Sequence, residues 1–310
     1  MQNAKLDYSR IAVLVPCYNE ELTVGQVVQD FKRALPGATV YVFDNNSKDK
    51  TVSIAKQAGA MVVHSPRQGK GNVVRHMFST VEADVYIMVD GDSTYPADAA
   101  PELVSVLVSS GVDMVVGTRI IEHDARSFRR FHKIGNILIT GMISFLFRIN
   151  VTDVLSGYRV FSRRMVKTVP LMAEGFEVET ELTLQTATKG FSFKEVQINY
   201  GKRPEGSFSK LSTYADGLLI LKAISVIFKD YKPLVFFGAV SIVFAVLSLI
   251  AGSFPILDYY EKKFVDHVPL AILAAALGIL SMLALGIGLI LDTAYKYHCE
   301  TFELWRRRRD

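Results

Sequence analysis

The residues best suited to chemistry are two aspartates, Asp90 and Asp92, separated by one glycine at the end of an apolar run. The run Val85–Val89 is rich in β-branched and aromatic residues, which is typical of a buried strand. Carboxylates this close repel each other unless a cation neutralises them, and their oxygens are ligands that Mg²⁺ or Mn²⁺ accepts. The spacing therefore predicts a metal site that holds a substrate diphosphate. Asp-Gly-Asp also suits a simple turn, so the surrounding sequence must decide between the two interpretations.

Polar segments follow other predicted strands in the same way. Hydrophobic periodicity predicts helices at 24–35 and 101–109, and strands at 11–15, 39–43, 61–64, 85–89 and 114–117. Strands that alternate with helices form a mainly parallel α/β sheet, and polar loops at successive strand ends are expected where one edge binds a polar ligand. This recurrence favours the metal site over the turn.

The carboxy-terminal third contains two uncharged apolar runs, Leu234–Phe254 and Val268–Leu291. Each is long enough to cross about 30 Å of hydrocarbon, and two buried core helices are the alternative. The basic tail Trp305–Arg309 is expected to stay in the cytoplasm and to attract anionic lipids. Both termini then lie in the cytoplasm, and residues 255–267 form a short outer loop. The polar start of the chain does not predict a signal peptide.

Charge and cysteine content exclude some classes of protein. The net charge is +4, and no nucleic-acid-binding module accompanies the basic tail, so nucleic acid is not an expected partner. The only cysteines, Cys17 and Cys299, lie in different contexts, so a disulfide framework is not expected and a reducing compartment is favoured. Gly278, Gly286 and Gly288 permit close helix packing, which allows a homo-oligomer.

Several motifs resemble the nucleotide-sugar half of family-2 glycosyltransferases. They are Pro16-Cys17-Tyr18-Asn19-Glu20, the loop Asp44–Thr51, Gly69-Lys70-Gly71 with Arg75, Asp90-Gly91-Asp92 and Gly117-Thr118-Arg119. Two later stretches, Asp153–Arg159 and Arg203–Leu211, resemble the polyprenyl-phosphate sugar synthases, the group of dolichol-phosphate mannose synthase and the bactoprenol glucosyltransferases. The resemblance implies a GT-A-like α/β fold with helices on both faces of the sheet. The expected organisation is a glycosyltransferase domain at 1–210, an interfacial helix at 211–230, a transmembrane hairpin at 231–294 and a cytoplasmic tail at 295–310.

The resemblance also implies roles for individual residues. Those implied to bind the nucleotide sugar are Pro16, Tyr18, Glu20, Asp44, Asn46, Lys70, Asp90 and Gly91. Those implied to bind the acceptor phosphate are Arg119, Arg129, Ser156, Arg159 and Ser209. The implied catalytic residues are Asp92, Asp153, Arg203 and Lys210, with Asp92 and Asp90 as the ligands of Mg²⁺ or Mn²⁺. Two positions depart from the family pattern, because Asn45 replaces a second aspartate and Thr94 replaces a metal-adjacent glutamine.

Two further stretches are open to two interpretations, and a third predicts a single one. Phe128–Phe147 predicts a helix with a basic start, which either lies at a lipid surface or is a domain helix with a solvated face. Glu177, Glu179 and Glu181 alternate, so at most one side of an extended strand faces a site, and Glu181 is either structural or supports the acceptor pocket. The helical spacing at 211–225 predicts an amphipathic interfacial helix that leads into the first span.

The residues and the resemblance together predict an inverting, metal-dependent transferase. It moves one sugar from a nucleotide diphosphate to a polyprenyl phosphate, undecaprenyl phosphate in bacteria, on the cytoplasmic leaflet of the inner membrane. UDP-glucose is the donor that the resemblance favours, with mannose or GlcNAc donors as alternatives. A processive polysaccharide synthase is disfavoured because two spans make a poor conduit. The alternative from another class is a sugar-nucleotide-binding membrane scaffold without turnover.

The acceptor bears on the choice of catalytic base. A phosphate monoester has its second pKa at about 6, so it is already largely ionised at neutral pH and needs no side chain to remove a proton. Asp153 is therefore expected to orient a basic side chain, Arg159 or Arg203, rather than to accept a proton.

Overall fold

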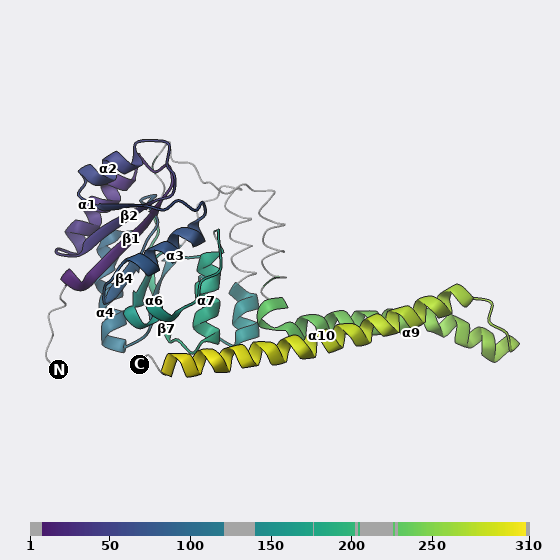
Figure 1. Cartoon of the computed structure of the whole chain (residues 1–310). Coiled ribbons are helices and arrows are strands. Elements are labelled where there is room, and N and C mark those ends of the chain that lie inside the picture. Colours follow the sequence, from purple (N-terminus) through teal and green to yellow (C-terminus); the bar gives the residue numbers. More distant parts are fainter. Residues whose placement is uncertain are drawn as a thin grey trace. The chain divides into compact units, whose positions relative to one another are not determined.

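The computed structural model describes residues 8–120, 140–175, 177–201, 204, 226 and 229–307. The chain divides into two compact units, Met1–Gly217 and Leu218–Asp310. The first unit carries every predicted nucleotide motif, and the second carries both predicted membrane spans (Figure 1).

A seven-stranded sheet forms the centre of the first unit (Figure 1). The strands are β1 (Ile11–Cys17), β2 (Thr39–Asp44), β3 (Met61–His64), β4 (Val85–Met88), β5 (Met114–Ile120), β6 (Arg159–Ser162) and β7 (Phe193–Asn199). Their order across the sheet is β3-β2-β1-β4-β6-β5-β7. The described strand pairs are parallel except those of β6, which runs antiparallel to β4 and β5. The predicted mainly parallel α/β sheet is confirmed, with one antiparallel strand inserted.

Helices cover both faces of this sheet (Figure 1). They are η1 (Tyr8–Arg10), α1 (Val24–Ala34), α2 (Thr51–Gln57), α3 (Lys70–Thr80), η2 (Ala97–Ala99), α4 (Ala100–Ser110), α6 (Arg163–Thr168) and α7 (Val178–Thr188). The apolar stripe of α1, which includes Val24, Val28 and Phe31, packs with Leu103 and Leu107 of α4 in one core cluster. Burying each such side chain contributes about 1.5–3 kcal/mol. The helices α3, α6 and α7 lie on the other face.

Two strands, β1 and β5, extend by two or more residues beyond their predicted ends. The prediction ended the first strand before Pro16, but β1 continues to Cys17. β4 pairs with β1 only as far as Leu14, so Pro16 is paired on one side and its missing N–H is tolerated. β5 continues past Gly117 because β7 pairs with it along its whole length. Thr118 and Arg119 therefore lie within a strand and not in a loop.

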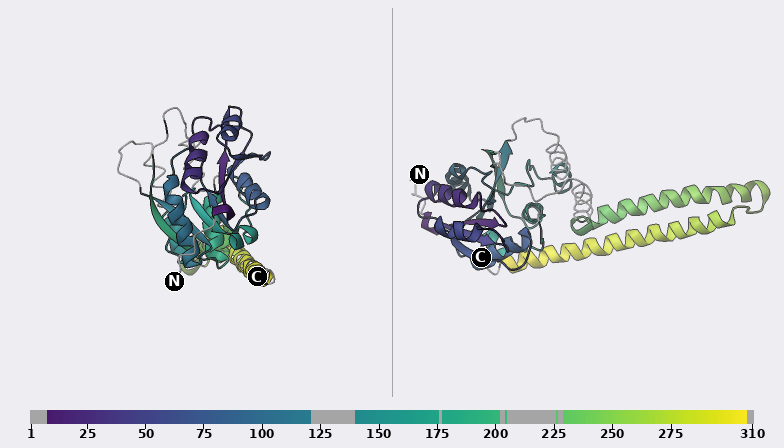
Figure 2. Two further views of the ribbon diagram at one scale, coloured as in Figure 1. Left: turned by 90° about the vertical axis from the view of Figure 1, so that its left-hand side faces the viewer. Right: turned by 90° about the horizontal axis from the view of Figure 1, so that it is seen from above.

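The second unit contains two long antiparallel helices, α9 (Pro233–Lys262) and α10 (Val268–Arg307) (Figure 2). Ser241 Oγ lies 3.0 Å from Ser281 Oγ, and Ser248 Oγ donates to the carbonyl oxygen of Ala274 at 2.7 Å. A Cβ at Gly288 would lie 2.9 Å from the Cβ of Phe237, so this glycine serves packing within the hairpin. Both helices are candidate membrane spans, with mean hydropathies of 2.7 and 2.5 in their apolar windows.

Both helices extend beyond the predicted spans. α9 continues through Pro255, which the prediction placed in the outer loop, so the connection shrinks to residues 263–267. Asp258 Oδ2 accepts a hydrogen bond from the backbone N of His267 at 3.1 Å and contacts its ring Nδ1 at 2.6 Å. These contacts hold the last turn of α9 against the connection. α10 likewise includes most of the predicted basic tail.

Candidate active site

The aspartate pair lies directly after β4, as predicted, at the carboxyl edge of the parallel strands. A Cβ at Gly91 would lie 2.7 Å from Sγ of Cys17, so only glycine fits between the two aspartates. Asp92 is 3% exposed, and its Oδ1 accepts hydrogen bonds from the backbone N of Thr94 at 3.1 Å and from its hydroxyl at 2.6 Å. Thr94 therefore orients Asp92, which gives a structural role to a position that departs from the family pattern.

The donor groups at this edge suit a cation that binds together with its substrate. Among the residues that the structure describes, no group of three or more His, Cys, Asp or Glu side chains could hold a metal ion. Mg²⁺ in phosphate-transfer sites usually binds one or two carboxylates and completes its coordination with water and substrate phosphates. Asp90 and Asp92 fit that pattern, and they do not form a closed protein site.

Lys70 places a buried positive charge beside Asp90. Its ammonium group contacts Oδ1 of Asp90 and lies 2.5 Å from Oε1 of Glu179. Burial opposes the charge on Lys70, but the attraction of Asp90 and Glu179 is stronger, so the pKa of Lys70 lies above its usual value. Lys70 therefore stays cationic over the physiological pH range.

The glycines beside Lys70 pack closely against a neighbouring segment of the chain. A Cβ at Gly69 or Gly71 would overlap carbonyl groups of the segment Leu171–Gly175, which we call the strap. The backbone N of Gly71 donates to two strap carbonyl oxygens, each at 3.0 Å, and Arg75 donates to two others at 2.8 and 3.0 Å. The two glycines therefore admit the strap, whereas the sequence suggested a loop that approaches a phosphate.

Two of the three alternating glutamates lie on a helix and the third is its N-cap residue, so the extended interpretation of this stretch is wrong. Glu177 precedes α7, and Glu179 and Glu181 lie in its first turn. Glu177 accepts hydrogen bonds from two backbone N–H groups of the strap at 3.0 and 3.1 Å. Glu181 accepts from two others at 2.8–3.0 Å. The outer pair therefore holds the strap, and Glu179 alone contacts Lys70.

A second ion pair joins Arg119 and Asp153. Arg119 Nε lies 2.7 Å from Oδ2 of Asp153, and Nη2 lies 2.8 Å from Oδ1, so the contact is bidentate. Burial opposes the charge on Arg119, but its hydrogen bonds to Asp153 outweigh this effect and raise the pKa of the guanidinium. The sequence predicts that Asp153 orients Arg159 or Arg203; among the described residues it pairs with Arg119, and Arg203 lies outside them.

Arg159 and Ser156, which the resemblance assigned to the acceptor phosphate, lie inside the domain. Arg159 is fully buried and donates to the carbonyl oxygens of Ser156 at 2.9 Å and Val154 at 2.6 Å, and to Thr183 Oγ1 at 3.0 Å. Burial lowers the pKa of Arg159 to about 10. The buried hydroxyl of Ser156 donates to the carbonyl oxygen of Gly117 at 2.6 Å. This placement does not support the predicted phosphate contacts, because both residues lead directly into the central strand β6.

Aromatic residues connect the two ion pairs. A Cβ at Gly157 would overlap the carboxylate of Asp90, and the backbone N of Gly157 donates to the hydroxyl of Tyr95 at 2.9 Å. The ring centroids of Tyr95 and Tyr200 lie 5.1 Å apart, and the guanidinium of Arg119 lies 5.5 Å from the centroid of Tyr200. Lys70–Asp90 and Arg119–Asp153 therefore belong to one continuous site.

The predicted nucleotide loop follows β2. Asp44 is buried at the strand end, and its Oδ1 accepts a hydrogen bond from the backbone N of Ser47 at 3.2 Å. Pro16 and Tyr18 lie at the end of the neighbouring β1, and the backbone N of Glu20 donates to Thr51 Oγ1 at 2.8 Å. Two adjacent loops of the carboxyl edge are therefore bonded to each other beside Asp44.

Asn45 and Asn46 tie this loop to the segment before α3. Asn45 Nδ2 donates to the carbonyl oxygens of Ser65 at 2.9 Å and Arg67 at 2.7 Å, while its Oδ1 accepts from the backbone N of Gly69 at 2.9 Å. An aspartate cannot donate either of the first two bonds. Asn46 has a φ of 66° and donates from Nδ2 to the carbonyl oxygen of Pro66 at 3.1 Å. The amide of Asn45 therefore joins the loop after β2 to the segment before α3.

Four predicted residues fall outside the described part of the chain, namely Arg129, Arg203, Ser209 and Lys210. Conversely, the sequence did not point to Glu179, Tyr95 or Tyr200. The spacing of Glu177 and Glu181, four residues apart after a glycine, is compatible with a helix start and could have suggested α7.

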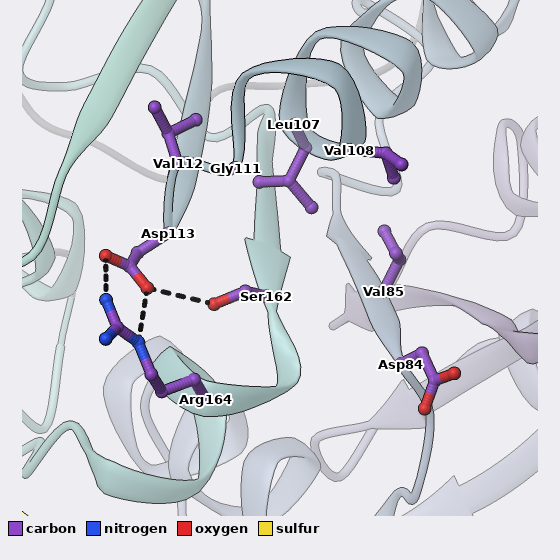
Figure 3. A pocket seen from close by; sticks show the side chains of 9 residues that line it. All are labelled: Asp84, Val85, Leu107, Val108, Gly111, Val112, Asp113, Ser162 and Arg164. Carbon is purple, nitrogen blue, oxygen red and sulfur yellow. Dashed lines mark hydrogen bonds and ion pairs between the residues drawn. The ribbon is translucent and has the colours of Figure 1, made fainter. Parts of the chain in front are cut away.

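A separate pocket of about 370 Å³ lies at the opposite edge of the sheet (Figure 3). Apolar side chains, among them Val85 and Leu107, line it together with Asp113 and Arg164. Arg164 forms a bidentate ion pair with Asp113 at 2.9 and 2.7 Å. None of the predicted site residues lines this pocket.

Comparisons with known proteins agree with this architecture. A glucosyl-3-phosphoglycerate synthase from Mycobacterium tuberculosis superimposes with a TM-score of 0.58 at 22% identity, covering 71% of this chain and 77% of that one, which supports the fold. Among relatives in sequence, Glycosyltransferase AglJ from Haloferax volcanii is 30% identical over 94% of this chain and 95% of its own length. A dolichyl-phosphate hexose transferase from the same organism is 31% identical over 70% of this chain and 93% of its own length. The model of the family "Glycosyl transferase family 2" matches residues 12–169, and the chain belongs to this family of glycosyltransferases.

Proposed function

We propose that this glycosyltransferase moves one hexose from a nucleotide diphosphate sugar to a polyprenyl phosphate at the cytoplasmic face of a bacterial membrane. The observation that carries the proposal is the joined site at the carboxyl edge, where the partly buried Lys70 pairs with Asp90 and the partly buried Arg119 pairs with Asp153. The same chain continues into two candidate membrane spans. The relative named as a dolichyl-phosphate hexose transferase supports a lipid phosphate as the acceptor.

The donor side is proposed to lie between the loop after β2 and the aspartates after β4. Asp44, Tyr18 and Glu20 would bind the nucleoside, while Asp90 and Asp92 would hold Mg²⁺ or Mn²⁺. The cation, when bound, supplies Lewis-acid stabilisation of the departing diphosphate. Structures of the mycobacterial synthase in complex with Mn²⁺, UDP and UDP-glucose support this class of donor, and UDP-glucose is the sugar nucleotide that we favour.

The acceptor side is proposed to form around Arg119. Asp153 fixes the guanidinium with two hydrogen bonds, which leaves its remaining N–H groups in a defined orientation toward phosphate oxygens. Arg203 and Lys210 would add positive charge. Since the acceptor phosphate is already ionised, the protein has to bring two anionic substrates together in line for an inverting displacement. Asp153 then acts as a positioning residue and not as a general base.

The two apolar helices support the membrane arrangement that we propose. Residues 1–210 would form the cytoplasmic catalytic domain, 211–230 an interfacial helix, 231–294 the hairpin and 295–310 a basic tail. Most side chains of the two apolar helices are exposed in the folded chain, which suits a lipid environment. The departures at Asn45 and Thr94 do not support a scaffold without turnover, because both residues orient other groups of the site.

A donor screen tests this function directly. Purified full-length protein would be incubated with undecaprenyl phosphate and radiolabelled UDP-glucose, UDP-GlcNAc or GDP-mannose, and the lipid fraction counted. We expect labelled lipid with one donor, loss of product in EDTA and recovery with Mn²⁺ or Mg²⁺. Asp92→Asn should lower turnover by about 10²–10³-fold at an unchanged thermal midpoint, because the site loses a strong electrostatic contact. Absence of labelled lipid with every donor would contradict the proposal.

A further inference from the structure

The innermost charges of the site form a chain of three residues, Glu179, Lys70 and Asp90. The ammonium of Lys70 lies 2.5 Å from Oε1 of Glu179 and also contacts Oδ1 of Asp90. The exposed fraction of the side chain is 5% for Glu179, 11% for Lys70 and 27% for Asp90. Asp90 is therefore the accessible end of the chain of charges, and Glu179 is the buried end.

Sharing one ammonium between two carboxylates changes the charge that Asp90 presents. Two carboxylates and one ammonium give the three residues a formal charge of −1, whereas a Lys70–Asp90 pair alone would be neutral. We propose that Glu179 is a positioning residue, which holds Lys70 between the two carboxylates so that Asp90 keeps negative charge for the divalent cation of the donor complex. The inference rests on the proposed function, which supplies that cation and its nucleotide.

The position of Glu179 is fixed by groups other than Lys70. Glu177 and Glu181, on either side of it in sequence, accept hydrogen bonds from backbone N–H groups of the strap. The strap in turn accepts hydrogen bonds from Gly71 and Arg75 of α3. Because the strap is hydrogen-bonded both to α3 and to the start of α7, Lys70 and Glu179 are held at a set separation. The contact between them is therefore part of the fold and not a chance meeting of flexible side chains.

The backbone of Glu179 has a separate structural role. Its carbonyl oxygen accepts a hydrogen bond from Thr183 Oγ1 at 3.1 Å, and Thr183 Oγ1 accepts from Arg159 Nη1 at 3.0 Å. The substitution Glu179→Gln leaves this carbonyl in place and keeps the length of the side chain. It therefore tests the charge of the side chain alone.

The test is the affinity of the full-length protein for UDP, measured by titration calorimetry in detergent with Mn²⁺ and, separately, with EDTA. The wild-type protein should bind UDP more tightly with Mn²⁺. In Glu179→Gln, Lys70 is drawn to Asp90 alone, so the gain in affinity from Mn²⁺ should fall by about tenfold or more, as expected for one unit charge at a partly buried site. Affinity in EDTA should be unchanged or higher, because the site has become less negative toward a diphosphate. A defect of folding would instead lower both affinities.

Two further variants make the comparison specific. Glu102→Gln removes an exposed carboxylate from the first turn of α4 and should behave as wild type. Glu179→Asp keeps the charge but shortens the side chain, so its Mn²⁺ gain should lie between those of wild type and Glu179→Gln, at unchanged affinity in EDTA. If Glu179→Gln does not fold, as judged by its thermal midpoint, Glu179→Asp carries the test.

Three outcomes of these titrations would contradict the inference. A wild-type Mn²⁺ gain in the Glu179 variants overturns the positioning role, and so does an equal loss of affinity with Mn²⁺ and with EDTA. Wild-type protein that binds no UDP in either condition contradicts the proposed function, and with it this inference. That last result appears before any variant is made, so the two failures are distinguishable.

Discussion

The substitution Asn45→Asp should destabilise the protein, although aspartate is the residue that the family pattern favours at this position. Asn45 is 4% exposed, and its amide donates to the carbonyl oxygens of Ser65 and Arg67. The variant loses both bonds and places a carboxylate against two carbonyl oxygens, while the bond from Gly69 remains. Each lost bond and its unsatisfied partner cost about 1–2 kcal/mol, so the total should be about 2–4 kcal/mol. For a domain of this size that corresponds to a fall in the thermal midpoint of about 5–15 °C.

Scanning calorimetry of the full chain in detergent would measure this fall. Asn46→Asp is the matched control, because Asn46 also donates to a carbonyl oxygen but lies in a more exposed position, and its effect should be below about 2 °C. The deficit of Asn45→Asp should shrink as pH falls, since burial raises the pKa of an aspartate there and the protonated form can donate one bond. Equal midpoints for Asn45→Asp and wild type at pH 7 would refute the structural role of Asn45.

Three other predictions concern the catalytic base, pH and topology. Asp153→Asn should retain more activity than Arg203→Ala and keep the acidic limb of the pH–rate profile. If Asp153→Asn were inactive while binding both substrates, and recovered activity at higher pH, Asp153 would be a general base. Burial raises the pKa of Asp113, but hydrogen bonds from Arg164 and Ser192 lower it more, to a value below the usual 3.8. The ionised Asp113 therefore stabilises the folded protein above about pH 4, and this contribution is lost as pH falls through the pKa of Asp113 in the folded state. Asp113→Asn should thus lower the thermal midpoint more at pH 7 than at pH 3, and equal deficits would contradict the assignment. A tag within residues 263–267 should be accessible only from outside, and tags at either terminus only from the cytoplasm; labelling of the 263–267 tag from the cytoplasm would overturn the hairpin topology.

The parts of the fold that depend on local sequence were predictable. β4 and its aspartates are adjacent in the chain, and the apolar stripe of α1 repeats at helical spacing, so each could be read without knowledge of the rest. The two apolar helices were predictable for the same reason. Their ends were not, because α9 passes through Pro255 and its last turn is held by a contact between Asp258 and His267.

Features that depend on distant partners could not be predicted. The alternation of Glu177, Glu179 and Glu181 fits a strand as well as a helix start, and the contact of Glu179 with Lys70, which lies far from it in sequence, could not be predicted from this pattern. The family resemblance implied that Arg159 binds the acceptor phosphate, whereas the structure shows it in the interior, where it donates to carbonyl oxygens and to Thr183. The antiparallel insertion of β6 likewise depends on pairing with β4 and β5, which lie far from it in sequence.

The most direct test of the central claim is the release of nucleotide from the sugar donor, measured with and without a lipid phosphate. Full-length protein in lipid nanodiscs would be given UDP-glucose and Mn²⁺, and free UDP would be followed over time, with Asp92→Asn protein as the inactive control. We expect UDP release that requires undecaprenyl phosphate and that equals, mole for mole, the glycolipid detected by mass spectrometry. Equal release without the lipid phosphate, or none with any sugar nucleotide, would contradict transfer to a polyprenyl phosphate.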